Sequence, residues 1–193
     1  MKIIELKNKN LATCSNVRSI IFYSKDNSDF KFNFKIDEIG GCYTFIQTKE
    51  NEVCYSMNNN SICFYDFKEK KKPSLSNISI IIRSSSELIM ISKNLSLIPG
   101  ENKITLININ EYILLSIIEV PGASWLLGVC MLSENMIVMG SYLKAIYQWK
   151  IEGNNWIFIS KKENAHNGNI SYLIKLENGY IASASDDSSI YVW

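Results

Sequence analysis

Histidine and arginine are scarce in this sequence of 193 residues, which contains one histidine and two arginines, Arg18 and Arg83. The formal net charge is +1. A chain with so little positive charge lacks the basic patch that nucleic-acid-binding domains use. The sequence also has no Gly-rich phosphate loop, no His/Cys cluster at metal-ligand spacing and no paired carboxylates at recurring strand ends. These absences predict no cofactor, no bound metal and no nucleic-acid partner.

Long apolar runs are absent too. The longest uncharged apolar-rich stretch, residues 120–133, is too short to cross a bilayer and contains Pro121 and Gly122. Residues 1–10 have neither the apolar core nor the cleavage site of a secretory signal peptide. The five cysteines form no C-x-x-C pair and fall mostly in predicted strands, which favours buried, reduced thiols over disulfides or metal ligands. We therefore expect an intracellular protein, cytoplasmic or nuclear, with no membrane association.

What the chain does have is an internal repeat. Thirteen-residue segments that each read as strand, turn and strand begin at residues 11, 53, 95, 137 and 181, so they are spaced 42 to 44 residues apart. Written beneath one another, they align without a gap. The last residues of the segments are Tyr23, Tyr65, Ile107, Trp149 and Trp193. Three residues before the end, every segment has isoleucine: Ile20, Ile62, Ile104, Ile146 and Ile190. The spacing is typical of four-stranded propeller blades, and the five isoleucines are predicted to occupy equivalent places in a shared interior.

Further strands fit around these hairpins. Strand a of each unit is predicted at residues 2–6, 42–47, 87–92, 125–132 and 170–176. Strand d is predicted at residues 30–36, 77–82, 112–120 and 156–161, where 30–36 shows the period-two alternation of a half-exposed strand. The sequence thus predicts one all-β domain, 1–193, a β-propeller of about five blades that forms an open arc because the fifth unit has only strands a, b and c. Its last strand would be an open sheet edge. Either the sequence is a piece of a longer propeller, or a partner chain in a multiprotein complex completes it with its own strands.

The stretch Ala165 to Trp193, AHNGNISYLIKLENGYIASASDDSSIYVW, resembles the WD-repeat family. The family pattern is a Gly-His pair, a strand, a turn, a Leu-Ala-Ser-Gly-Ser strand, an Asp turn and a closing Trp. Ala165 replaces the Gly of the pair, and the Asp that usually follows the Trp is missing, since Lys150 follows Trp149. The resemblance implies a propeller fold and a role as a protein-binding subunit of multiprotein assemblies.

Four residues match the structural tetrad of that family: His166, Ser183, Asp187 and Trp193. The resemblance implies a hydrogen-bond relay between them that fixes neighbouring strands. Ser, His and Asp also suggest a hydrolase triad, but this serine is predicted in mid-strand and no G-x-S-x-G element accompanies it. The first four units do not repeat the tetrad. At the Ser183 position they have Thr13, Tyr55, Leu97 and Met139, and at the Asp187 position Val17, Asn59, Glu101 and Leu143.

We expect partner-binding residues in the b–c and d–a loops, because these loops emerge together on one face of a propeller. Arg18 and Lys144 fall in b–c loops, Lys103 follows a third b–c turn, and Arg83 falls in a d–a loop. Because arginine binds carboxylates and phosphates bidentately, these residues suggest a weakly basic face for an acidic or phosphorylated segment. The alternative is that they are ordinary polar loop residues. The remaining candidates are the aromatic anchors Tyr142 and Trp125, of which Trp125 is equally expected in the core, and Asp186 in the fifth b–c turn.

The function predicted from these observations is a non-enzymatic protein–protein interaction scaffold that uses its b–c and d–a loop face. The alternative from another class is an enzyme or a small-molecule binder that uses the central channel. Polar groups converging at the starts of the a strands would favour it, but the residues there are mostly apolar or serine.

Overall fold

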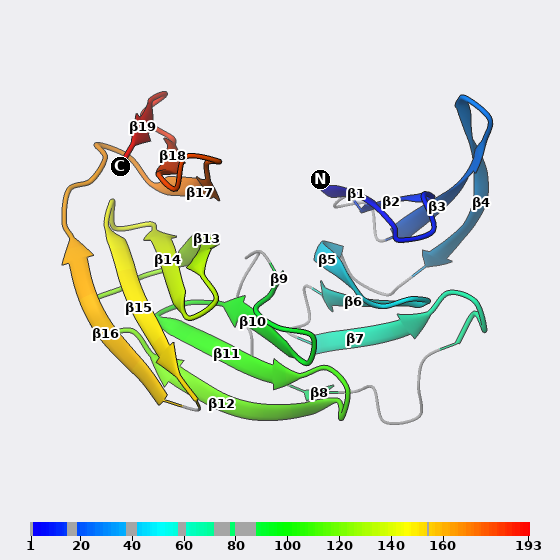
Figure 1. The fold of residues 1–193 in the computed structure, drawn as a ribbon, viewed down its shortest axis with the longest axis horizontal. Helices are drawn as coiled ribbons and strands as arrows, with labels where there is room; N and C mark the ends of the chain where they lie inside the picture. Colours follow the sequence, from blue (N-terminus) through cyan, green and yellow to red (C-terminus); the bar gives the residue numbers. More distant parts are fainter. Residues whose placement is uncertain are drawn as a thin grey trace.

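Five antiparallel sheets follow one another along an arc in the computed structural model of the chain (Figure 1). The structure describes residues 2–14, 19–37, 42–57, 61–71, 78–79, 88–153 and 155–193. In these ranges every regular element is a strand, and no helix there is long and apolar enough to cross a membrane. The predicted all-β propeller of five blades is therefore confirmed.

Each sheet is one blade, whose strands a to d lie side by side in chain order. Blade 1 consists of β1 Lys2–Glu5, β2 Leu11–Cys14, β3 Ser19–Asp26 and β4 Asp29–Asp37. Blade 2 consists of β5 Cys42–Lys49, β6 Glu52–Met57, β7 Ser61–Asp66 and β8 Ile78–Ser79. Blade 3 consists of β9 Ile89–Met90, β10 Leu95–Pro99, β11 Lys103–Asn108 and β12 Ile113–Glu119. Blade 4 consists of β13 Leu126–Ser133, β14 Met136–Ser141, β15 Ile146–Glu152 and β16 Asn155–Lys162. Blade 5 consists of β17 Ile170–Lys175, β18 Ile181–Ser185 and β19 Ile190–Val192.

The five predicted hairpins are all present, and the a and d strands lie where the sequence predicts them to within a few residues. The largest difference concerns blade 3, whose strand a is only Ile89–Met90. Of the predicted strand 77–82 in blade 2, residues 78 and 79 are described and form a strand, and the rest lies outside the described residues. Blade 5 has three strands, as predicted, and Figure 1 shows the arc open between it and blade 1.

The core lies between the blades. Because successive side chains of a strand point to opposite sides, each blade has one layer of side chains toward the next blade and one toward the preceding blade. We call these layers its forward face and its backward face. At the first junction, Cys14 and Ile20 on the forward face of blade 1 pack with Val53 and Tyr55 on the backward face of blade 2. Equivalent apolar clusters join blades 2 and 3, 3 and 4, and 4 and 5. Among the described residues, no core cluster joins blade 5 to blade 1, which is why the arc is open.

The repeated isoleucine lies on strand c and points forward. In blades 1 to 4 it is buried by the next blade, with exposed fractions of 1% for Ile20, 0% for Ile62 and Ile104, and 7% for Ile146. Ile190 in blade 5 is 71% exposed, because no described blade covers its face. The prediction of equivalent environments is therefore correct for four isoleucines and wrong for the fifth.

The gapless alignment of the five hairpins is wrong in blade 3. In blade 2 the first and last residues of the segment pair, Val53 with Tyr65, whereas in blade 3 Ser96 pairs with Ile107. Its turn is one residue shorter, because Pro99 ends β10 and the Gly100 N–H donates to the Lys103 carbonyl at 2.8 Å. The residue at the place of Ser183 is consequently Ile98, which packs backward on blade 2, while Leu97 packs forward on blade 4.

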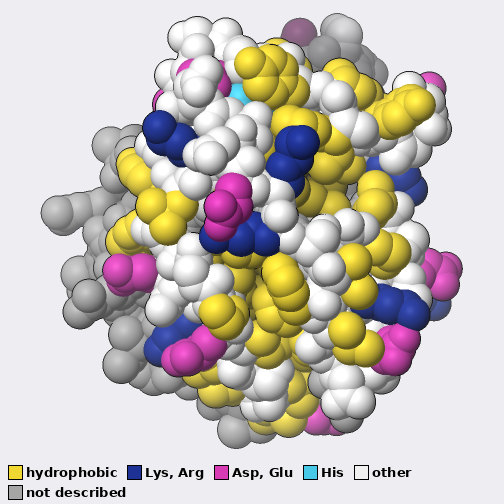
Figure 2. Space-filling view, turned by 90° about the vertical axis from the view of Figure 1, so that its left-hand side faces the viewer, with side chains coloured by type: hydrophobic (Ala, Val, Ile, Leu, Met, Phe, Trp, Pro, Cys, Tyr) yellow, Lys and Arg dark blue, Asp and Glu magenta, His cyan; other side chains and the backbone are white. Residues whose placement is uncertain are grey.

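The outer strands leave large apolar side chains exposed. On β16 these are Ile157, Phe158 and Ile159, and on β12 Ile113, Leu115 and Ile117 are similarly exposed. Figure 2, which looks onto the left-hand side of the arc in Figure 1, shows hydrophobic side chains there, interspersed with lysines and acidic residues.

Candidate functional site

The b–c and d–a loops of blades 3 to 5 form the best-described part of the predicted binding face. They comprise the b–c loops 100–102, 142–145 and 186–189 and the d–a loops 120–125 and 163–169. The predicted tetrad lies at the blade 5 end of this group of loops.

The tetrad of blade 5 is assembled as the resemblance implied. The Trp193 indole N–H donates to Ser183 Oγ at 2.8 Å, and Ser183 Oγ lies 2.7 Å from His166 Nε2. His166 Nδ1 lies 3.1 Å from Asp187 Oδ2. These partners fix the tautomer: Nδ1 carries the proton and donates to the carboxylate, and Nε2 accepts from the serine hydroxyl. The relay links the loop before β17 to β18 and to the residue after β19.

Asp187 anchors the turn between β18 and β19. Its carboxylate accepts from the Ser189 N–H at 2.9 Å, from the Ser189 hydroxyl at 2.6 Å and from the Asn167 N–H at 2.8 Å. The Ser189 hydroxyl, together with these N–H groups and His166, lowers the pKa of Asp187 well below its usual range. Gly168 permits this approach, because a Cβ on it would lie 2.7 Å from the Asp187 nitrogen. The loop and the turn are thus held in contact.

Burial of the relay argues against the hydrolase alternative. Ser183 is 0% exposed and His166 is 2% exposed, and the ring of Tyr191 stacks on the imidazole with centroids 4.5 Å apart. Ser183 lies in the middle of β18, and its oxygen already accepts the indole N–H of Trp193. A substrate carbonyl cannot reach this hydroxyl without displacing the stacked rings. The arrangement is that of a structural network, in which buried polar groups are mutually satisfied.

Asp186, beside the relay, presents an anion at the surface. Its carboxylate accepts from the Ser171 hydroxyl at 2.6 Å and from the Asn169 side-chain amide at 3.0 Å, and its own N–H donates to the Asn169 carbonyl at 3.0 Å. These hydrogen bonds, that of Ser171 foremost, lower the pKa of Asp186. The side chain is therefore exposed at the surface yet held in one orientation.

The b–c loop of blade 4 continues the face. Tyr142 and Leu143 expose 49% and 54% of their surface. The backbone beneath them is fixed, since the Tyr142 N–H donates to the Trp125 carbonyl and the Lys144 carbonyl accepts from the Ala165 N–H, both at 2.8 Å. Trp125 itself is half-buried and bridges to Glu101 of blade 3. The loops of three successive blades are therefore linked by backbone hydrogen bonds.

The predicted cationic residues are not gathered by the described part of this face. Lys103, the first residue of β11, pairs with Glu119 at 3.9 Å. Lys144 lies exposed on a different blade. Arg18 and Arg83 lie outside the described residues, as do Val17 and Asn59 of the tetrad comparison. With Asp186 and Glu101 also exposed, the described loops present both signs of charge.

Sequence reasoning missed a polar network at the junction of blades 2 and 3, on the side of the a–b and c–d loops. The buried carboxylate of Glu52 accepts from the Thr48 hydroxyl at 2.7 Å and from the hydroxyl of Tyr112 in blade 3. Lys49 Nζ donates to the Tyr112 oxygen at 2.7 Å and lies 3.3 Å from Glu52 Oε1. Burial and the contact with Glu52 raise the pKa of Tyr112. No local pattern points to this network, because its two blades contribute residues 60 positions apart.

An open cavity of about 320 Å³ lies beside this network and is lined by Lys49, Glu50, Asn51, Glu52, Asp66, Lys71 and Tyr112. Several of its polar groups are already paired: Lys49 with Glu52, and Asp66 with the N–H groups of Lys68 and Glu69. The described residues contain no group of three or more His, Cys, Asp or Glu side chains able to hold a metal. All five cysteines are buried and none forms a disulfide, as predicted.

Comparison with models of known protein families and with curated protein sequences finds no match. Among solved structures, 1416 chains match. One is the computationally designed Ika8 protein, with a TM-score of 0.76 and 14% identity, where the alignment covers 99% of this chain and 57% of that one. Another belongs to a structure of the Mitotic Checkpoint Complex, with a TM-score of 0.79 and 11% identity, covering 95% of this chain and 60% of that one. This chain thus spans less than two thirds of either, and at such identities the matches show the propeller fold alone.

Proposed function

We propose that the protein is a non-enzymatic scaffold that binds other proteins through the b–c and d–a loops of blades 3 to 5. The observation that carries the proposal is the fixed backbone beneath exposed recognition groups. Asp186 is held by Ser171 and Asn169, and Tyr142 is held by the Trp125 carbonyl. A surface that is ordered before binding loses little conformational entropy when a partner docks. The match to a chain in a mitotic checkpoint complex is compatible with such a role.

The partner we infer is a protein segment that offers a hydrogen-bond donor to Asp186 and an apolar side chain to Tyr142 and Leu143. We further propose that Lys144, together with Arg18, Arg83 and Lys103, favours acidic or phosphorylated residues in that segment. We assign His166, Ser183 and Asp187 a structural role and propose no catalytic activity. The intact relay of blade 5 supports a divergent WD-repeat protein, and the five buried thiols support an intracellular location.

The test is quantitative affinity purification from the cells that make the protein, with the double variant Tyr142→Ala, Asp186→Asn. We expect at least one protein retained by the wild type to decrease by about tenfold or more, since truncating an interface anchor commonly weakens binding by 1.4 kcal/mol or more. The matched control is Tyr180→Ala, which removes a tyrosine of similar exposure from the a–b turn of blade 5, outside the b–c and d–a loops. An unchanged partner set in the double variant would refute the proposal.

The acidic-segment component has its own test. Reversal of charge at Arg18 and Lys144 together should weaken partner recovery, and adding salt should weaken it for the wild type as well. If recovery is unaffected by both changes, the face does not recognise acidic segments, although it can still bind proteins.

A further inference from the structure

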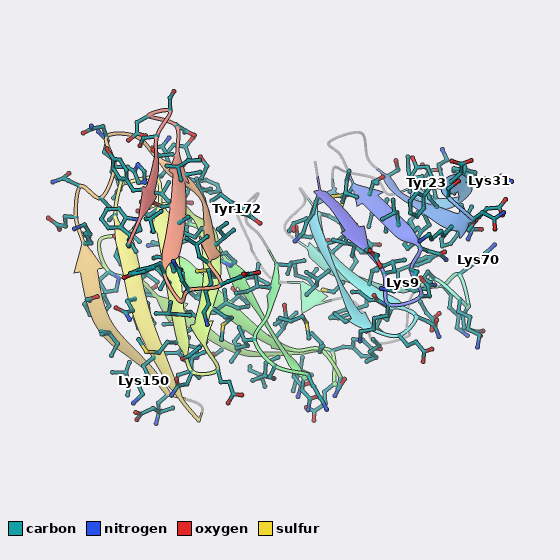
Figure 3. The ribbon with its side chains drawn as sticks, turned by 45° about the horizontal axis from the view of Figure 1, so that its top comes forward. Lys9, Tyr23, Lys31, Lys70, Lys150 and Tyr172 are labelled. Carbon is teal, nitrogen blue, oxygen red and sulfur yellow. The ribbon has the colours of Figure 1, made fainter. Side chains whose placement is uncertain are left out.

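The sequence contains two asparagine–glycine pairs, and they lie on either side of β17. Asn167-Gly168 is in the d–a loop before this strand, and Asn178-Gly179 is in the a–b turn after it. Figure 3 shows this part of the arc with its side chains, where the label of Tyr172 marks β17. An asparagine before glycine is chemically unstable, because the glycine nitrogen, which no Cβ hinders, attacks the side-chain amide. Both asparagines are exposed, so contact with solvent alone does not distinguish the two pairs.

The backbone of the first pair is fixed. The Asn167 N–H donates to Asp187 Oδ2 at 2.8 Å. Gly168 lies so close to the b–c turn that a Cβ on it would be 2.7 Å from the Asp187 nitrogen and 3.1 Å from the Asp186 carbonyl carbon. Attack on the side-chain amide requires the glycine nitrogen to turn toward it, and a reaction of two groups in one chain is fast only where that geometry is reached. These contacts hold the peptide in place and therefore slow the reaction of Asn167.

The second pair has the opposite environment. Residues 177–180 are all exposed, and a Cβ on Gly179 would have no atom within 4 Å. The Asn178 side chain already folds over the turn, because its Oδ1 accepts from the Tyr180 N–H at 3.2 Å. Negative charge develops on this oxygen when the amide carbon is attacked, so the Tyr180 N–H is placed as an oxyanion donor. The Gly179 N–H closes the turn on the Leu176 carbonyl at 3.0 Å, and release of one bond in an exposed turn is a local opening of low free energy.

We propose that Asn178 is a site of spontaneous covalent modification, which converts it to aspartate and isoaspartate while Asn167 stays intact. The Gly179 nitrogen loses its proton to hydroxide and forms a bond to Asn178 Cγ. The bond between Cγ and Nδ2 breaks, and the side-chain nitrogen takes a proton from water and leaves as ammonia. Water then opens the resulting five-membered succinimide. Opening at the side-chain carbonyl gives aspartate, and opening at the main-chain carbonyl gives isoaspartate.

The products change the turn between β17 and β18. Both add a negative charge beside Glu177, and isoaspartate also lengthens the main chain of the turn by one methylene group. The Leu176 N–H donates to the Tyr180 carbonyl at 2.7 Å across this turn, so its hydrogen bond depends on the length of the chain between them. The modification therefore loosens the start of the β17–β18 hairpin as the protein ages. The turn lies outside the loops that carry the proposed scaffold function, and either proposal can fail without the other.

Trypsin separates the two pairs for the test, since cleavage after Lys162 and Lys175 gives the peptides 163–175 and 176–193. The purified protein is kept in mildly alkaline buffer, digested briefly at intervals and analysed by mass spectrometry. Fragment ions locate the gain in mass that accompanies conversion of amide to acid, and methylation by an isoaspartyl methyltransferase identifies isoaspartate. A parallel sample in concentrated urea removes the folded environment. Asn178→Gln is the matched control, because its amide carbon is one methylene group farther along the side chain.

In the folded protein, Asn178 should convert at least about tenfold faster than Asn167, whereas in urea the two rates should agree within about threefold. The peptide 176–193 of Asn178→Gln should stay unmodified. The proposal is overturned if Asn178 converts no faster than Asn167 in the folded protein. It is equally overturned if the ratio of the two rates persists in urea, because the difference would then come from the local sequence and not from the fold.

Discussion

Replacing Ser183 with alanine tests whether the relay holds blade 5 together. The substitution removes the acceptor of the Trp193 indole N–H and the donor to His166 Nε2. Each polar group left buried without a partner costs about 1–3 kcal/mol. His166 is almost fully buried, whereas Trp193 is only partly buried, so the two losses together should destabilise blade 5 by roughly 2–4 kcal/mol.

The effect should be local, because a blade contacts only its neighbours and sub-global unfolding is the rule in repeat architectures. Blade 5 packs on blade 4 alone among the described blades. Hydrogen exchange followed by mass spectrometry should show peptides from β18 and β19 exchanging roughly 30- to 1000-fold faster, since 1.4 kcal/mol corresponds to a factor of ten. Peptides from blades 1 to 3 should be unchanged.

The control is Ser160→Ala, which removes an exposed hydroxyl that hydrogen bonds Gln148 at 3.2 Å on the neighbouring blade. It should change stability by less than about 0.5 kcal/mol. A double-mutant cycle with Trp193→Phe should give a coupling energy of about 1 kcal/mol, because that variant removes only the indole donor. Exchange in β18 and β19 that is as slow in Ser183→Ala as in the wild type would refute the structural role of the relay.

Three further predictions concern stability. Gly168→Ala should destabilise the protein by about 1–3 kcal/mol, because the added Cβ meets backbone atoms of residues 186–187. Gly100→Ala should be tolerated, because a Cβ there lies 3.6 Å from the Lys103 carbonyl oxygen, which is an ordinary contact. Equal unfolding midpoints of the two variants would contradict this prediction. Glu52→Ala should lower the free energy of unfolding by roughly 1–3 kcal/mol, and Tyr112→Phe should lower it by about 1 kcal/mol, because each removes hydrogen bonds at the junction of blades 2 and 3. Thermal unfolding measures both losses, and Glu50→Ala, at an exposed residue, is the control that should leave the stability unchanged. Because the folded pKa of Asp187 lies below its ordinary value of 3.8, the stability that its carboxylate contributes is complete above that pH and is lost as the pH falls further. The unfolding midpoint of Asp187→Asn should therefore depend less on pH below about 4 than that of the wild type. Unfolding midpoints of the two proteins that fall equally with pH would refute the stabilising role of the ionised carboxylate.

The repeat made the fold predictable because it fixes the period of the blades and, in four of the five hairpins, the register between strands b and c. A hairpin recurring every 42 to 44 residues, with isoleucine three residues before its end, placed every b and c strand without knowledge of a single contact. The register error in blade 3 arose because Pro99 and Gly100 shorten the turn by one residue while the flanking apolar residues still match. In an Ile- and Leu-rich strand, a slip by one residue leaves the sequence pattern almost unchanged.

The site was only partly predictable for a different reason. The relay of blade 5 was found because its four residues match a family pattern. Its supports, such as Asn167 and Ser189 around Asp187, are common loop residues that acquire their role from the turn geometry. The network of Glu52 and Tyr112 joins two blades through residues that no repeat relates. Likewise, the pairing of Lys103 with Glu119, which weakens the predicted basic face, depends on strand pairing across the c–d turn.

The restriction of the relay to blade 5 follows from how the blades are buried. In blades 2 and 4 the place of Ser183 is taken by Tyr55 and Met139, which are fully buried, and each of these blades packs against a neighbour on both faces. Besides their backbone pairing, the b and c strands of these blades are therefore held by apolar burial on both faces. Strand β19 has all three residues exposed and packs on one side only. A polar relay that ties Trp193 and Asp187 to His166 supplies the order that two-sided burial supplies elsewhere.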